Sequence, residues 1–421
     1  MNHELPIMNS RVSDRLLIAL FCTALALPTA ARLGGWSDAF QVEVEKRLPA
    51  PWPTVETRTA GPISWPRTGS LEAFPAKFEA WLNDRLGLRR AMLQSFAWAR
   101  LQGFIPSAAT AFSDGGLGGS PVLIGRDGWL FYAGQGSIES FRRTRPFTAA
   151  ELDRWRTVLR ERREWLARRG IAYLVVIAPD KHTIYPEQMP ASLTPVGPKS
   201  RLDQLVAALN SPDDAPLLDL RPTLLAGKAV RPVYYKTDSH WNAYGAHLAE
   251  SAMVERLRDS VPTLRIPSIQ DFDLIESPTS QGGDLAVMLD APIPPDDWRI
   301  ELRPRRTRVA ATDSESIDLG GGLYVRGNIS TCTSAAGGTA IVLHDSFFEE
   351  PRASFSEHWR RAVYVHTYDF PTDLIDRERP QVVIQEIVER GLMNLHPANP
   401  PLRDSRSSST HWARRDGDPV R

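Results

Sequence analysis

Continuous apolar runs alternate with amphipathic segments through the middle and the C-terminal third of the chain. Runs without internal polar positions are typical of parallel strands that are buried on both faces of a sheet. The strands expected on this basis are residues 172–178, 340–343, 362–365 and 382–384, and a short strand is expected at 216–220.

The segments between these runs carry helix signals. Thr148-Ala-Ala-Glu151 is a capping box, and the helix that follows it has one apolar face and ends near Gly170. A second helix is expected at residues 200–209, and Asn242 is placed to cap a third. Strands that alternate with helices in this way predict an α/β sandwich with a mainly parallel sheet.

Less regular segments complete the predicted domain, residues 71–395. Apolar residues at helical spacing predict a helix at 71–103, and the segment 122–132 is typical of a β-hairpin turned by Asp127-Gly128. Residues 260–338 are rich in proline, glycine and charge, so we interpret them as an insertion or lid that can include short strands.

The N-terminal end has the pattern of an export signal. Arg11 and Arg15 precede an apolar run at 16–31, and a basic flank before such a run directs export. We expect residues 1–32 to be a retained signal-anchor with its basic side in the cytoplasm, although cleavable small-residue sites are present as well. The domain would then lie in the periplasm on the inner membrane, behind an extended tether at 33–70.

Composition excludes several classes of function. Over 421 residues, Lys+Arg and Asp+Glu balance at 50 each, so no overall positive charge attracts the chain to nucleic acid. Cys22 lies inside the N-terminal apolar run and Cys332 lies far downstream, so we expect no disulfide between them. The sequence has no CxxC motif and no His/Cys cluster that would indicate a metal site. We expect neither a metal nor a cofactor, and a disordered tail at 396–421.

Two short segments carry candidate chemistry. In Thr237-Asp-Ser-His-Trp-Asn242, the carboxylate of Asp238 can reach the imidazole of His240 and fix its tautomer; alternatively, Asp238 only caps a helix. Ser346 follows an apolar strand, where an α/β sheet presents ligands; alternatively, it is an ordinary N-cap. The sequence does not establish that the two segments meet.

Other residues could line the same site or support it. Trp241, Trp298 and Trp359 could stack on sugar rings, although most tryptophans are core residues. His182, His247, His358 and His366 have no evident partner. The site-lining candidates are Lys181, Trp241, His344, Asp345 and Glu386.

The chain resembles the alginate O-acetyltransferase AlgJ/AlgX family. The matching stretches run in order along residues 75–393. They are Trp81-Leu-Asn-Asp-Arg-Leu-Gly-Leu-Arg89, Ile124-Gly-Arg-Asp-Gly-Trp-Leu-Phe-Tyr132, Ala178-Pro-Asp-Lys-His182 with Tyr185-Pro-Glu187, Thr237-Asp-Ser-His-Trp-Asn242, Gly283-Asp-Leu-Ala286, His344-Asp-Ser-Phe347 and Pro380-Gln-Val-Val-Ile384 with Glu389-Arg390.

This resemblance implies an SGNH-hydrolase-like three-layer sandwich with a Ser-His-Asp triad. It assigns Ser346 as nucleophile, His240 as base and Asp238 as the orienting acid. In ordinary SGNH enzymes the nucleophile comes first in the chain, so the resemblance implies a circularly permuted order. We expect no carbohydrate-binding module of the AlgX kind after the domain, which favours the AlgJ type, and the polymer need not be alginate.

The family implies transfer of acetyl groups to hydroxyls of an exported exopolysaccharide. The acetyl donor is then a membrane-embedded acyltransferase, and other assembly proteins are partners. Two alternatives remain open from the residues: an esterase in which water replaces the sugar hydroxyl, and a non-enzymatic protein that binds or assembles polysaccharide.

Overall fold

The computed structural model describes residues 121–279, 282–289, 297–306 and 311–402, parts of 49–85, and a few isolated residues elsewhere. None of the helices formed by these residues combines the length and the apolar character that crossing a membrane requires. The expected signal-anchor and the tail beyond residue 402 lie largely outside the described residues, so both stay predictions.

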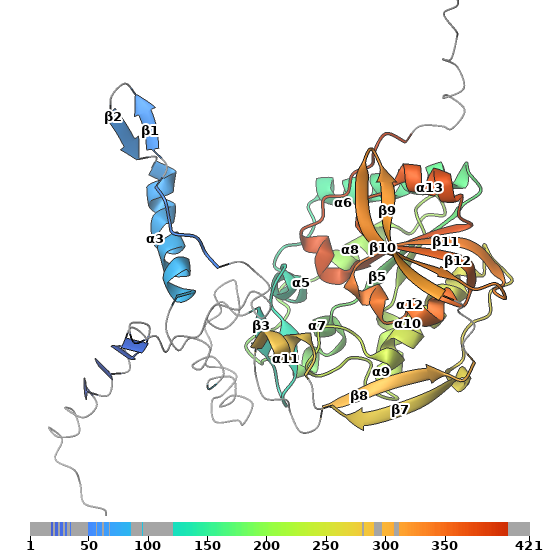
Figure 1. Ribbon diagram of the computed structural model, residues 1–421, viewed down its shortest axis with the longest axis horizontal. Coiled ribbons are helices and arrows are strands. Elements are labelled where there is room, and N and C mark those ends of the chain that lie inside the picture. Colours follow the sequence, from blue (N-terminus) through green and yellow to red (C-terminus); the bar gives the residue numbers. More distant parts are fainter. Residues whose placement is uncertain are drawn as a thin grey trace, which may run out of the picture.

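A seven-stranded sheet forms the centre of the domain, in the order β6-β5-β13-β11-β12-β10-β9 (Figure 1). The first five strands run parallel, and β10 and β9 add an antiparallel edge. The expected mainly parallel sheet is therefore confirmed. The strands are β5 (Ala172–Ala178), β6 (Leu217–Asp219), β9 (Ala311–Gly320), β10 (Leu323–Thr331), β11 (Gly337–His344), β12 (Trp359–His366) and β13 (Val382–Val388).

Helices cover both faces of this sheet, which makes three layers (Figure 1). Successive residues of a strand point to opposite faces. Accordingly, Leu174 and Val176 of β5 join one core, whereas Tyr173 and Val175 join the other. The longer helices are α6 (Ala149–Ala167), α8 (Arg201–Ala208), α9 (Arg221–Lys228), α10 (Ala243–Leu257) and α13 (Thr372–Glu378).

The expected helix starts are present. Thr148 and Glu151 form the predicted capping box of α6, and Asn242 accepts the backbone N–H of Gly245 at the start of α10. The short helices are α5 (Ser137–Arg142), α7 (Lys181–Ile184), α11 (Asp284–Leu289), α12 (Arg352–Ser356), η3 (Pro186–Gln188), η4 (Ile269–Asp271), η5 (Ser346–Glu349) and η6 (Glu389–Met393).

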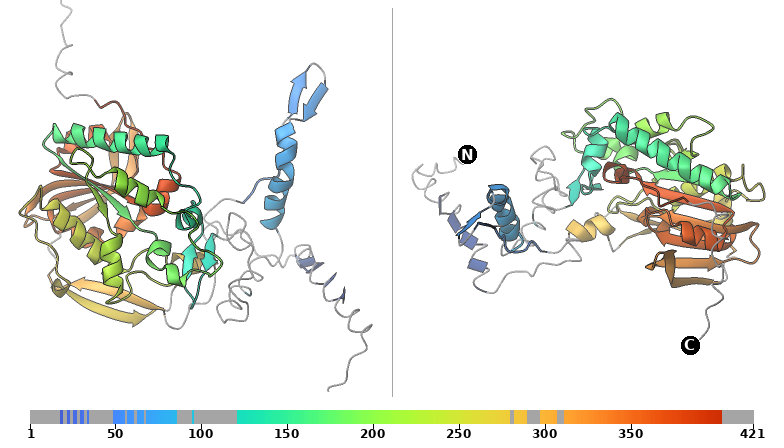
Figure 2. Two further views of the ribbon diagram at one scale, coloured as in Figure 1. Left: turned by 180° about the vertical axis from the view of Figure 1, so that it is seen from behind. Right: turned by 90° about the horizontal axis from the view of Figure 1, so that it is seen from above.

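The stretch 260–338, predicted as one insertion or lid, forms two separate strand pairs. β7 (Phe272–Pro278) and β8 (Trp298–Pro304) pair as a separate two-stranded sheet on the opposite side of the molecule from α6 (Figure 2). β9 and β10 instead extend the central sheet. Their polar residues concealed this role, because an edge hairpin has one exposed face and lacks a continuous apolar run.

The predicted hairpin around Asp127-Gly128 is confirmed. β3 (Val122–Ile124) pairs with β4 (Leu130–Tyr132), and both turn residues have positive φ, at 50° and 77°. Glycine and aspartate tolerate this left-handed conformation. The N–H of Leu130 donates to the carbonyl of Lys236, so the hairpin contacts the segment that holds Asp238.

The segment before the domain is more regular than an extended tether. β1 (Thr57–Ala60) pairs with β2 (Ile63–Pro66), and α3 (Thr68–Asn83) follows directly. The helix therefore starts inside the stretch predicted as tether. Most of the predicted helix beyond residue 85 lies outside the described residues.

Candidate active site

Ser346 begins η5, directly after β11 ends at His344. It therefore lies at the carboxyl edge of the parallel strands, where α/β folds bind ligands. Asp345 fixes the turn: its Oδ1 accepts the N–H of Phe347, and its Oδ2 accepts the N–H of Val388 on β13. Ser346 itself is only partly buried, so its hydroxyl is accessible.

His240 is held by a loop that precedes α10. Tyr234 and Trp241 form an isolated antiparallel bridge, and the N–H of Asn242 donates to the carbonyl of Val233. This closed loop carries Asp238 and His240 to the end of β11. The ring of Phe347 lies 4.9 Å from the ring of His240 and 5.1 Å from that of Trp241, and so packs beside the imidazole.

The three side chains form a continuous hydrogen-bonded chain. Ser346 Oγ lies 2.8 Å from His240 Nε2, and His240 Nδ1 lies 2.7 Å from Asp238 Oδ1. The backbone N–H of His240 also donates to Asp238 Oδ1, at 2.9 Å. A carboxylate on Nδ1 selects the Nδ1–H tautomer, which leaves Nε2 free to accept the serine proton.

The electrostatics of this group suit a base with an ionised partner. Burial alone would lower the pKa of His240, but the hydrogen bond and charge of Asp238 raise it above its usual value. Burial would raise the pKa of Asp238, yet the bonds from His240 hold it well below its usual range. Asp238 therefore stays ionised and stabilises an imidazolium that forms at His240.

Lys181 holds the loop that carries Asp238 by hydrogen bonds to its backbone. It is 2% exposed, and its Nζ donates to the carbonyls of Tyr235, Lys236 and Asp238 at 3.1, 3.0 and 2.6 Å. Burial lowers the pKa of Lys181 to about 7, while three acceptors match the three N–H groups of the ammonium form. Lys181 thus holds the backbone that carries Asp238 and does not line an open site.

Asp284 and Gly283 also belong to the site, although no role for them was evident from the sequence. Asp284 accepts the N–H and the hydroxyl of Ser239 at 2.7 and 2.6 Å, and its own N–H donates to Asp238 Oδ2 at 3.1 Å. Burial and the charge of Asp238 raise the pKa of Asp284. The sequence signal for these two residues was their place in the stretch Gly283-Asp-Leu-Ala286, which matches the family.

Asp180 and Arg390 form a second unassigned feature near the site. Arg390 Nη1 donates to Asp180 Oδ1 at 2.6 Å, and the two side chains are 8% and 5% exposed. The guanidinium lies 5.5 Å from the ring of Phe347. Asp180 precedes Lys181 at the end of β5, so this pair joins the carboxyl ends of β5 and β13 next to Phe347.

The remaining predicted lining residues lie behind the site, because their side chains are buried. Trp241 is 1% exposed and packs on Phe347. Asp345 and His344 are 4% and 2% exposed. Glu386 is fully buried and accepts the N–H of Asp345, and burial raises its pKa well above the usual value. These residues support the strand ends on which Ser346 sits.

An open cleft adjoins the site on the side of Asp238. Its volume is ≈ 260 Å³, and its lining includes Trp298 and Arg299 of β8 and Glu350 beyond η5. Trp298 is 49% exposed, whereas Trp359 is fully buried. Of the tryptophans considered for sugar stacking, Trp298 is thus the one with an accessible ring.

Gly283 leads to a first prediction. A Cβ at this position would lie 2.6 Å from Asp238 Oδ2, too close for the carboxylate to stay in place. We expect Gly283→Ala to lower kcat for ester cleavage about 10²-fold or more, because a displacement of about 1 Å in a site costs that much. Hydrolysis of p-nitrophenyl acetate measures the loss.

The control for this prediction is Gly338→Ala. There the nearest atom to a Cβ is Oε1 at the end of the Gln381 side chain, at 3.2 Å, and no atom of the candidate site is within 4 Å. Equal activity of the two variants would show that the close approach of Gly283 to Asp238 is unimportant.

Comparison with known families defines the class of the domain. The family model for the SGNH hydrolase-like domain of the acetyltransferase AlgX matches residues 122–324. This region includes Asp238, His240 and Asp284, and Ser346 lies beyond its end. Residues 122–324 are therefore similar to the SGNH hydrolase-like domain of that family, which agrees with the α/β fold of this chain.

The resemblance to the AlgJ/AlgX family is confirmed by individual relatives. "Probable alginate O-acetylase AlgJ" of Pseudomonas aeruginosa is 29% identical over 57% of this chain and 55% of its own length. The protein of the same name from Azotobacter vinelandii is 30% identical over 35% of this chain and 36% of its own length. The chain thus spans about half the length of the first of these relatives and about a third of the second.

Two solved structures are similar to this one. The O-acetyltransferase domain of Pseudomonas putida AlgJ is 23% identical, with a TM-score of 0.44 over 66% of this chain and 93% of that domain. PatB1 of Bacillus cereus is 12% identical, with a TM-score of 0.49 over 64% of this chain and 96% of that protein.

Proposed function

We propose that this protein transfers acetyl groups, through an acyl-serine, to hydroxyls of an exported bacterial exopolysaccharide. The observation that carries the proposal is the chain of short contacts from Ser346 through His240 to Asp238. The resemblance to alginate O-acetylases supports acetyl as the group and a polysaccharide as the acceptor.

In the first step, Ser346 Oγ attacks the acetyl carbonyl while its proton moves to His240 Nε2. The leaving group departs with that proton, and acetyl-serine remains. The N–H of Phe347 is already bonded to Asp345, whereas that of Ser346 has no acceptor among the described residues. The Ser346 N–H is therefore available to stabilise the oxyanion.

In the second step, a sugar hydroxyl attacks the acetyl-serine. Its proton moves to His240, the acetyl group moves to the sugar oxygen, and Ser346 is restored with the proton. The cleft beside Asp238 supports a place for the acceptor, because Trp298 offers a ring face and Arg299 a cation at its wall.

The cellular setting is part of the same proposal. The basic-then-apolar N-terminus supports export and anchoring on the periplasmic side of the inner membrane. A membrane-embedded acyltransferase would then deliver the acetyl group, with other exopolysaccharide assembly proteins nearby. Asp238 and His240 precede Ser346 in the chain, which supports a circularly permuted SGNH arrangement.

The experiment supplies p-nitrophenyl acetate as donor and uronic-acid or neutral oligosaccharides as acceptors. Mass spectrometry then measures acetylated oligosaccharide, and an enzyme assay measures free acetate. We expect acetylated oligosaccharide to rise with acceptor concentration. Free acetate alone, with every acceptor, would identify an esterase, and failure of a serine-directed phosphonate to label Ser346 would indicate a non-enzymatic protein.

The pH dependence follows from His240. The base must be neutral to accept the serine proton, so activity is lost as pH falls through its pKa. Because Asp238 raises that pKa above 6.5, we expect the acid limb of kcat/KM to have its midpoint above this value. Asp238→Asn removes the charge, so the midpoint should move to lower pH. An unchanged midpoint would mean that another group controls the limb.

A further inference from the structure

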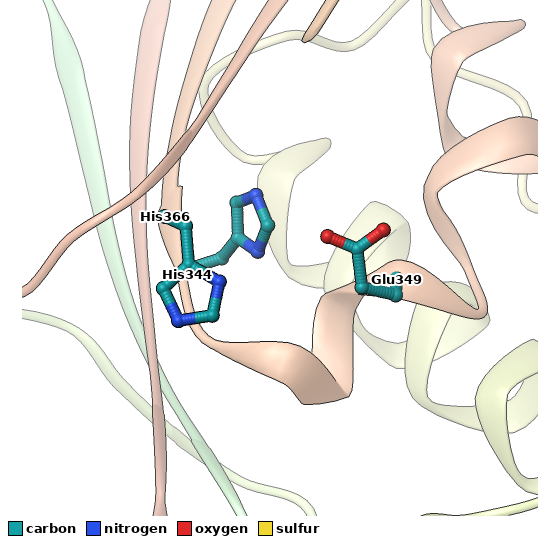
Figure 3. Close-up of side chains that lie close together, drawn as sticks. All are labelled: His344, Glu349 and His366. Atoms are coloured by element: carbon teal, nitrogen blue, oxygen red, sulfur yellow. The ribbon is translucent and has the colours of Figure 1, made fainter. Parts of the chain in front are cut away.

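Three metal-binding side chains converge on one space beside η5. They are His344 at the end of β11, His366 at the end of β12 and Glu349 at the end of η5. One ligand atom from each lies within 4.8 Å of the others. Figure 3 shows the carboxylate of Glu349 pointing toward the two imidazole rings.

The sheet itself brings the two histidines together. His344 and His366 are register partners on the parallel strands β11 and β12, and their ring centroids lie 5.7 Å apart. The N–H of Thr367 donates to the carbonyl of His344, which fixes the two strand ends. Register partners project to the same face of a sheet, so this pairing does not depend on a flexible loop.

The hydrogen bond of His344 Nδ1 leaves Nε2 as the ring nitrogen that can bind a metal ion. Its Nδ1 lies 2.6 Å from the carbonyl oxygen of Asp345, so Nδ1 carries the proton and donates it there. Nε2 then has a free lone pair. Histidine ligands in metal sites commonly donate their other ring N–H to a backbone carbonyl in this way.

We propose that His344, His366 and Glu349 bind a Zn²⁺ ion. Two imidazoles and one carboxylate are a zinc ligand set, with the fourth position left for water. Zinc ligands sit roughly 3.3 Å from one another, so the set must close slightly. His366 and Glu349 are exposed and can rotate, and the competing ion pair of Glu349 with Arg352 is partly exposed and therefore weak.

Such an ion would link both ends of η5 to the strand ends of the sheet through its ligands. His344 lies just before η5 and Glu349 is its final residue, so the bound ion would restrain the turn that begins at Ser346. Zn²⁺ binding does not rest on the proposed acetyl transfer, and its test needs no activity assay.

The test uses the full chain without a histidine tag, freed of metal by a chelator and titrated with Zn²⁺ by calorimetry. We expect one strong site per chain. His366→Ala and Glu349→Ala should each weaken it by about tenfold or more. These exposed positions are chosen because replacing the buried His344 could unfold the protein. Co²⁺ should give the visible absorption of a tetrahedral site, and both variants should lose it.

Two controls locate the ion. His396→Ala removes an exposed histidine outside the three proposed ligands and should leave Zn²⁺ binding unchanged. His240→Ala tests a second group of suitable ligands among the described residues, Asp238, His240 and Asp284, and should also leave Zn²⁺ binding unchanged. The proposal is overturned by an absence of saturable binding, by full-strength binding in the His366→Ala/Glu349→Ala double variant, or by binding that His240→Ala abolishes.

Discussion

Replacing Ser346 by alanine is expected to lower acetyl transfer by about 10⁴-fold or more. The change removes the only atom that can hold the acetyl group in the proposed mechanism, and single losses in serine triads have effects of this size. His240→Ala should cost about as much, because both residues act on the same proton. The measurement is the initial rate of oligosaccharide acetylation, with p-nitrophenyl acetate as donor.

The matched control is Ser334→Ala, an exposed serine between β10 and β11. It should leave the rate unchanged. Ser346 is only partly buried, so its loss of one oxygen should leave the melting temperature close to that of the wild type. A folded Ser346→Ala protein that still acetylates at the wild-type rate would end the proposed mechanism.

Replacing Arg390 by methionine is expected to lower the free energy of unfolding by about 3–5 kcal/mol, because it leaves a buried carboxyl without its partner. Asp180 Oδ2 already has no hydrogen-bond partner among the described residues. Burial raises the pKa of Asp180 and the guanidinium opposes that shift, so loss of Arg390 forces the carboxyl to take up a proton or move. Urea denaturation at neutral pH measures the change.

A second variant separates the ion pair from simple loss of packing. Asp180→Asn combined with Arg390→Met removes both charges and should recover part of the lost stability. Arg303→Met, in the exposed pair with Glu301, is the surface control and should cause no measurable change. If Arg390→Met destabilises the protein no more than Arg303→Met, the buried pair is unimportant for stability.

Local sequence patterns determined much of this protein. Apolar runs predicted β5, β11, β12 and β13, since a strand covered on both faces is mostly apolar, and the short segment 216–220 predicted β6. The capping residues Thr148 and Asn242 marked helix starts, because their side chains satisfy free backbone N–H groups within three residues. The family motifs also assigned Ser346, His240 and Asp238 before any geometry was available.

Distances between remote segments were decided only by the tertiary structure. Ser346 and His240 are 106 residues apart, and their 2.8 Å contact depends on the order of strands in the sheet. The sequence did not predict that β9 and β10 extend the central sheet, because a half-exposed hairpin resembles a loop in composition. The three loop carbonyls around Lys181, the Asp180–Arg390 pair and the pairing of His344 with His366 likewise arise from contacts between segments. The local periodicity of apolar residues does not predict such contacts, because they depend on how distant segments of the chain pack against each other.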